Sequence, residues 1–159
     1  MSAQTLLPRR EAKTFRGHTM ATEPLDILVV DDSRDCAESL AMILRMEGHC
    51  VRALYSGADA YTSFVMRVPD VAILDLEMPE LDGFTLAKKM RVHALESVML
   101  IALTGWGRTE DREATRRAGF DLHFVKPVHP RKLFAALTIC GGRAAQPSWN
   151  GAEPPLDFP

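Results

Sequence analysis

The sequence has no long hydrophobic run. No apolar stretch among its 159 residues approaches the roughly 20 residues that cross a bilayer as a helix. The N-terminal segment, MSAQTLLPRREAKTFRGH, also lacks the apolar centre of a secretory signal. We therefore expect a cytoplasmic protein.

Cysteine and histidine are too few, or too scattered, to predict a metal centre. Cys36, Cys50 and Cys140 include no Cys-x-x-Cys pair, and we expect all three to be buried free thiols. The histidines show no ligand spacing such as His-x-x-x-His, so we expect them at the surface or partly buried. They are His18, His49, His93, His123 and His129.

There is also no excess of basic charge. The 19 basic residues stand against 21 acidic ones, a net charge of −2, which gives no support for a general nucleic-acid binder. Hydrophobic residues make up 47% of the chain and fall in short runs, as expected of a folded core. The length fits one domain, which we place at 25–140 between disordered tails at 1–24 and 141–159.

Within that domain, short apolar runs alternate with segments of helical period. We expect strands at 27–30, 51–54, 71–74, 98–103 and 122–125. Ser33 is the predicted N-cap of a helix that ends near Glu47, before Gly48. Further helices are expected at 57–66, with Tyr61 and Val65 on one face, at 84–90, at 109–117, and at 130–139, with one apolar stripe made by Leu133, Ala136, Leu137 and Cys140. The alternation predicts a doubly wound α/β domain with a five-stranded parallel sheet.

Polar residues follow these strands at the edge where open parallel sheets have their sites. They are Asp31, Asp32, Asp75, Thr104 and Lys126. Carboxylates that converge repel one another unless a cation is present, and Mg²⁺ prefers such oxygen ligands. Lys126 and Thr104 can stabilise a phosphoryl group in transfer, and Asp75 can serve as its nucleophile.

Four segments carry a family resemblance: ILVVDDS (27–33), ILDLEMPELDGF (73–84), ALTGWG (102–107) and FVKP (124–127). Together they resemble the receiver domain of bacterial two-component response regulators, with flavodoxin-like topology. The resemblance covers nearly all of 25–140. The last two segments look similar to receivers of hybrid histidine kinases, which hints at a phosphorelay role.

The resemblance implies a role for each site residue. Asp75 is the phosphoacceptor, Asp32 a direct ligand of Mg²⁺ or Mn²⁺, and Asp31 its acidic neighbour. Glu77 matches the position whose backbone carbonyl binds the metal. Thr104 is the switch hydroxyl and Lys126 pairs with the phosphoryl oxygens. Pro127 matches a proline whose peptide bond is often cis.

Four positions depart from the family pattern or add to it. His123 stands where an aromatic side chain often swings as the threonine moves, so the usual aromatic switch is in doubt. The Glu77 side chain can face the metal and alter attack by water, which predicts an effect on the lifetime of the phosphorylated state. Gly105 leaves room for the phosphoryl group, and Trp106 either contacts a partner or covers the loop.

Two other functions fit parts of the pattern. Haloacid-dehalogenase-type phosphatases also combine an aspartyl nucleophile with a second acid two residues on, as in Asp75 and Glu77, but they carry the nucleophile on the first strand. A flavodoxin-like cofactor binder needs a phosphate loop after its first strand, where Asp31 and Asp32 would repel the phosphate.

We therefore expect a stand-alone receiver that is not an enzyme acting on a separate substrate. The family implies a phosphohistidine donor on a sensor kinase or histidine phosphotransfer protein. Phosphorylation is expected to alter a surface made by the fourth helix, fifth strand and fifth helix, for an output partner or as a relay step. We expect no direct contact with nucleic acid or membrane.

Overall fold

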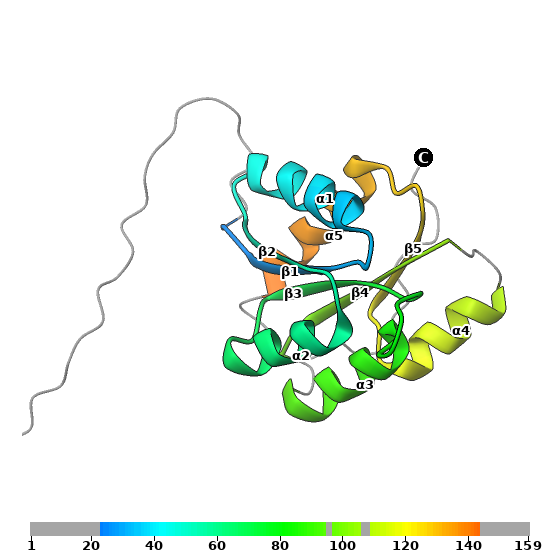
Figure 1. The fold of residues 1–159 in the computed structure, drawn as a ribbon. Helices are drawn as coiled ribbons and strands as arrows, with labels where there is room; N and C mark the ends of the chain where they lie inside the picture. Colours follow the sequence, from blue (N-terminus) through cyan, green and yellow to red (C-terminus); the bar gives the residue numbers. More distant parts are fainter. Residues whose placement is uncertain (1–22, 95–96, 106–108, 144–159) are drawn as a thin grey trace, which may run out of the picture.

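The computed structural model describes residues 23–94, 97–105 and 109–143. Its chain alternates strand and helix throughout, as the sequence predicts (Figure 1). The strands are β1 (Asp26–Val30), β2 (Cys50–Leu54), β3 (Val71–Asp75), β4 (Met99–Thr104) and β5 (Leu122–Val125). The helices are α1 (Arg34–Met46), α2 (Gly57–Met66), α3 (Gly83–Ala94), α4 (Thr109–Ala118) and α5 (Pro130–Arg143).

The strands form one parallel sheet in the order β2-β1-β3-β4-β5. Helices α1 and α5 cover one face, and α2, α3 and α4 cover the other (Figure 1). The order reverses next to β1, so the chain winds outward in both directions from the middle of the sheet. The prediction of a doubly wound five-stranded α/β domain is confirmed.

The alternation of side chains along each central strand explains the two layers. On β1, Ile27 and Val29 pack in the cluster with α1 and α5, whereas Leu28 and Val30 pack in the cluster with α2 and α3. Successive side chains of a strand point to opposite faces, so a strand covered on both sides must be apolar throughout. The same holds for β3, whose five residues are all buried.

Several local predictions are confirmed. The Ser33 side chain accepts a hydrogen bond from the Cys36 N–H (3.4 Å) and caps α1. Gly48 follows that helix with a φ of 95°, a left-handed conformation that glycine adopts without steric cost. The predicted stripe of α5 is buried against the sheet: Leu133, Ala136, Leu137 and Cys140.

The face that Tyr61 and Val65 share on α2 is not its core face. Ala60 and Phe64 make the core face, Tyr61 is partly buried, and Val65 is 43% exposed. Apolar residues surround this short helix, so its period alone does not identify the buried side. Cys36 and Cys50 are exposed rather than buried, because Cys36 lies on the outer side of the first turn of α1 and Cys50 opens the edge strand β2.

His49 also differs from its prediction, since it is buried. Its Nδ1 accepts a hydrogen bond from the Leu25 N–H (3.3 Å). Helices α3 and α5 extend further than predicted, to Ala94 and Arg143. The predicted tails lie outside the described residues, apart from 23–24, which precede β1, and 141–143, which the structure places in α5 and not in a disordered tail. Of the helices described, none has the length and apolar character that a membrane span requires.

Candidate phosphoacceptor site

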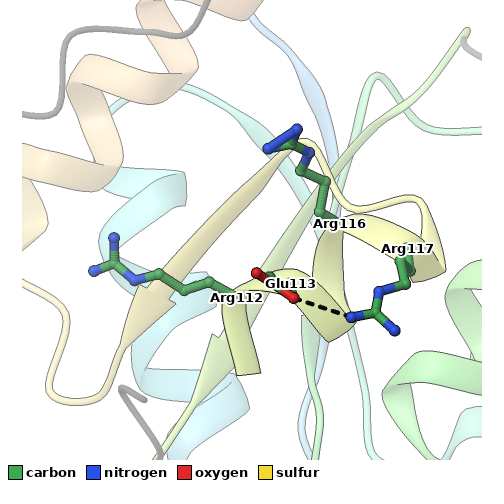
Figure 2. Close-up of a pocket in the computed structure, with 4 residues that line it drawn as sticks. All are labelled: Arg112, Glu113, Arg116 and Arg117. Carbon is green, nitrogen blue, oxygen red and sulfur yellow. Dashed lines mark hydrogen bonds and ion pairs between the residues drawn. The ribbon is translucent and has the colours of Figure 1, made fainter. Parts of the chain in front are cut away.

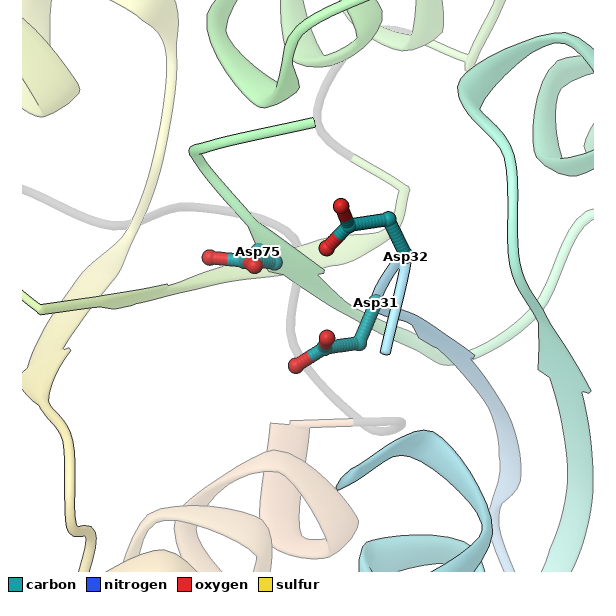
Figure 3. A group of neighbouring side chains, drawn as sticks. All are labelled: Asp31, Asp32 and Asp75. Carbon is teal, nitrogen blue, oxygen red and sulfur yellow. The ribbon is translucent and has the colours of Figure 1, made fainter. Parts of the chain in front are cut away.

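Three aspartates meet at the carboxyl ends of β1 and β3. Asp31 and Asp32 directly follow β1, and Asp75 ends β3, its neighbour in the sheet. One carboxylate oxygen from each lies within 4.8 Å of the others (Figure 3). Asp31 and Asp75 are buried, and Asp32 is exposed. The strand order therefore brings together acids that are more than forty residues apart in the sequence.

Lys126 reaches this cluster from the end of β5. Its Nζ lies 2.8 Å from Asp31 Oδ2 and 3.1 Å from Asp75 Oδ2. Its backbone N–H donates to the carbonyl of Thr104 (2.7 Å), which fixes the start of the loop after β5 against the end of β4. The lysine offsets part of the negative charge, but one ammonium group stands against three carboxylates.

Backbone N–H groups orient the two buried carboxylates. The Ser33 N–H donates to Asp31 Oδ1 (2.9 Å), and the Glu77 N–H donates to Asp75 Oδ1 (3.4 Å). Each acid therefore accepts from a residue two positions further on, which holds one oxygen toward its own loop. The other oxygen of each acid is the one that contacts Lys126.

Gly83 allows the loop after Asp75 to fold back on itself. Its N–H donates to the carbonyl of Leu76 (3.2 Å). A Cβ at this position would lie 2.2 Å from the carbonyl oxygen of Asp75 and 2.9 Å from the Cα of Leu76. Only glycine fits this approach without displacing main chain. Asp82 directly precedes α3, and its side chain accepts a hydrogen bond from the Thr85 N–H (2.8 Å). Sequence reasoning missed Gly83, although its place after Asp82 was a signal for a turn.

Electrostatics at the site favour a bound cation. Burial raises the pKa of the Asp75 carboxyl, and the nearby Asp31 charge adds to that effect, whereas Lys126 and the Glu77 N–H oppose it. Burial alone would lower the pKa of Lys126, but its hydrogen bonds to Asp31 and Asp75 outweigh burial and raise it. The buried carboxylates are thus short of positive charge, and a hard divalent cation with oxygen ligands fits this donor set.

The remaining predicted residues lie at the ends of the strands and in the loops that follow them. Thr104 ends β4 and is 2% exposed. Glu77 is exposed, and its side chain is open to solvent beside Asp75. The Lys126–Pro127 peptide bond is cis, in line with the family pattern. Gly105 is exposed, and none of the described residues beyond its chain neighbours has an atom within 4 Å of the place a Cβ would take. Trp106 lies outside the described residues.

His123 makes a contact that sequence reasoning did not predict. Its Nδ1 lies 3.2 Å from the Oγ1 of Thr115 on α4. Thr115 is buried, and its hydroxyl also donates to the carbonyl of Arg112 (2.8 Å). A polar contact between β5 and α4 therefore stands at the position where related proteins often carry an aromatic ring.

Comparisons with known proteins agree with this geometry. The family model for the response regulator receiver domain matches residues 27–138. An uncharacterized 14.6 kDa protein from the sodA1 3′ region of Leptolyngbya boryana is 38% identical over 110 residues, which are 69% of this chain and 84% of that protein. The transcriptional regulatory protein GltR of Pseudomonas aeruginosa is 34% identical over 135 residues, which are 84% of this chain and 56% of GltR. The chain spans about half the length of the curated transcriptional regulators that it matches.

Solved structures show the same fold. A putative response regulator from Chloroflexus aurantiacus superposes with a TM-score of 0.71 at 33% identity, and the match covers 76% of this chain and all of that one. The chemotaxis protein CheY4 of Vibrio cholerae gives a TM-score of 0.70 at 25% identity, with 74% of this chain and 99% of that chain covered. The chain belongs to the response regulator receiver domains, the signalling domains of two-component systems.

Proposed function

We propose that Asp75 accepts a phosphoryl group from a phosphohistidine of a sensor kinase or histidine phosphotransfer protein, in a reaction that requires Mg²⁺. The observation that carries the proposal is the contact of Lys126 with both Asp31 (2.8 Å) and Asp75 (3.1 Å), inside a cluster of three carboxylates. A cation held by Asp31, Asp32 and Asp75, with the Glu77 carbonyl as a further ligand, would neutralise charge on the transferring group.

Three side chains would carry out the transfer itself: Asp75, Lys126 and Thr104. A carboxylate oxygen of Asp75 attacks phosphorus, the P–N bond to the donor histidine breaks, and its electron pair returns to the imidazole. Lys126 already lies beside an Asp75 oxygen, so its ammonium can pair with the phosphoryl oxygens as they arrive. The Thr104 hydroxyl, at the end of the adjacent strand β4, is the proposed hydrogen-bond donor to one of them.

Transfer would change the surface of the molecule through β4 and β5. We propose that movement of Thr104 and Lys126 toward the phosphoryl group alters the surface of α4, β5 and α5, where an output partner or the next relay protein binds. Because kinases take their phosphoryl groups from cytoplasmic ATP, the proposal includes a cytoplasmic location. The position of Asp75 on the third strand, not the first, disfavours the haloacid-dehalogenase alternative.

Intact-mass spectrometry after incubation with acetyl phosphate tests the proposal. The wild-type chain is expected to gain the mass of one phosphoryl group in the presence of Mg²⁺ and none when EDTA replaces the metal. Asp75→Asn is expected to gain nothing, whereas Glu47→Gln, which changes an exposed acid at the far end of α1, should behave as wild type. If Asp75→Asn were phosphorylated as fully as wild type, the assignment of the acceptor would be wrong.

A further inference from the structure

The exposed side of α4 carries a hollow of about 410 Å³ that is distinct from the acidic cluster (Figure 2). Four side chains of this helix line it, and all of them are exposed. They are Arg112, Glu113, Arg116 and Arg117. We call this surface the arginine hollow. It shares no residue with the proposed phosphoacceptor site.

The positive charge of the arginine hollow is only partly neutralised. Arg117 Nη2 pairs with Glu113 Oε2 one turn away at 3.0 Å (Figure 2). In the part of the chain that the structure describes, Arg112 and Arg116 make no ion pair. These two lie four residues apart on the same side of the helix, where like charges repel each other. Among the side chains that the structure describes, the hollow therefore presents two guanidinium groups that are not paired with a carboxylate.

Stabilisation of the helix itself does not account for all of this charge. Cations near a helix C-terminus interact favourably with the helix dipole, which is a sufficient reason for Arg116 and Arg117. In the sequence, Glu110 and Asp111 occupy the first turn of α4, where negative charge is favourable. Arg112 comes directly after them, in the first half of the helix, where the dipole does not favour a cation.

The opposite side of α4 is held against the body of the domain. Thr115 and Ala118 are buried, and the Thr115 hydroxyl lies 3.2 Å from the His123 ring of β5. The helix cannot turn its arginines inward without breaking this contact. A partner that bound here would meet Arg112 and Arg116 already directed to solvent.

We propose that the arginine hollow is a docking surface for an acidic segment of a partner protein. Guanidinium groups bind carboxylates through paired N–H donors, and Arg112 and Arg116 provide two such groups on one helix face. The whole chain has a net charge of −2. The positive charge of the hollow is therefore a local feature of a slightly acidic protein. This inference rests on the proposed function in taking α4 as part of the surface that phosphorylation alters.

Fluorescence anisotropy with a short fluorescein-labelled glutamate peptide tests the docking surface on the full chain. At about 0.01 M ionic strength, where the Debye length is about 30 Å, the wild type is expected to bind the peptide. Arg112→Glu combined with Arg116→Glu should weaken binding by about tenfold or more, because attraction becomes repulsion. Arg112→Gln combined with Arg116→Gln, which only neutralises the charges, should give a smaller loss.

A matched control separates the hollow from general charge attraction. Lys88→Glu combined with Lys89→Glu makes the same change in net charge on α3, which is not part of the surface of α4, β5 and α5, and should leave peptide binding unchanged. Equal weakening by both double variants, or no weakening by the α4 variant, would overturn the proposal. So would tighter binding of a single-stranded oligonucleotide of the same charge at this surface, which would make the hollow a nucleic-acid site.

Phosphorylation is measured on the same samples, so that failure of one proposal is not mistaken for failure of the other. The α4 double variant should still gain one phosphoryl group from acetyl phosphate and unfold at the wild-type temperature. Peptide binding by a wild-type chain that Mg²⁺ and acetyl phosphate do not modify would support the docking surface and contradict the proposed acceptor role. Phosphorylation without peptide binding would contradict only the docking surface.

Discussion

Gly83→Ala tests whether the close approach behind the phosphoacceptor is required by the fold. The added methyl carbon would lie 2.2 Å from the carbonyl oxygen of Asp75 and 2.9 Å from the Cα of Leu76. Both are main-chain atoms, so no side-chain rotation relieves the overlap, and either the end of β3 or the start of α3 must move. The hydrogen bond from the Gly83 N–H to the Leu76 carbonyl would be distorted by the same movement.

The expected cost follows from these contacts. Overpacking costs about 1–3 kcal/mol, and we expect about 3 kcal/mol here because main chain must shift. The better helix propensity of alanine offsets less than about 1 kcal/mol of this loss at the start of a helix. A net loss of about 2–3 kcal/mol corresponds to a fall in Tm of roughly 8–12 °C for a domain of this size.

Thermal and urea unfolding followed by circular dichroism measure this loss. Gly105→Ala is the matched control, because no atom of the described residues beyond its chain neighbours lies within 4 Å of its added carbon and its φ is not positive. Its Tm should be unchanged or slightly higher, since alanine restricts the unfolded chain. The variant Gly83→Ala should also accept phosphate from acetyl phosphate more slowly, as the Asp75 backbone is displaced. An unchanged Tm for Gly83→Ala would refute the reasoning.

Four further predictions concern His49, Asp75 and Glu77. Burial lowers the pKa of His49 below its usual 6.5, so stability is full above that pH and falls on acidification toward the folded-state pKa, with a slope of at most about 1.4 kcal/mol per pH unit. His49→Asn, which keeps an acceptor for the Leu25 N–H, should remove this part of the slope in urea titrations between neutral and acidic pH, and an identical slope would count against it. Burial raises the pKa of the Asp75 carboxyl above its usual value. The free energy of unfolding therefore falls as pH rises from the usual carboxyl pKa to the raised one, and Asp75→Asn should raise Tm at neutral pH without metal. Mg²⁺ at ten times its Kd should stabilise the wild type by about 1.4 kcal/mol and Asp75→Asn by less, so equal Mg²⁺ stabilisation of both would exclude Asp75 as a ligand. Glu77→Gln should prolong the phosphorylated state several-fold, because it removes an exposed carboxylate that can assist attack by water, and equal dephosphorylation rates would dismiss that role.

The order of elements could be predicted from the sequence because each strand is a short apolar run that ends at a polar residue. The same rule predicts Asp31, Asp75, Thr104 and Lys126 as site residues, since parallel strands bring their carboxyl ends to one edge. The structure adds that β1 and β3 are neighbours and that Lys126 contacts both buried acids.

What failed were predictions that depend on the surroundings of one side chain. The period of α2 did not distinguish Phe64 from Val65, because both are apolar and the helix is short. Burial of His49 depends on the Leu25 N–H, 24 residues away in the sequence, and local composition carries no signal for such a pair. The role of Gly83 depends on a main-chain approach that appears only once the loop after β3 is folded.

Strand β5 is anchored by polar contacts at both of its ends. His123 binds α4 through Thr115, and Lys126, just past the last residue of the strand, binds the two buried carboxylates. Three residues of extended chain, about 10 Å, join these anchors. Because successive side chains of a strand alternate in direction, one residue inserted between them would preserve one anchor and lose the other. The two contacts therefore fix the length of this segment, whereas its hydrophobic residues can be exchanged for others of similar volume.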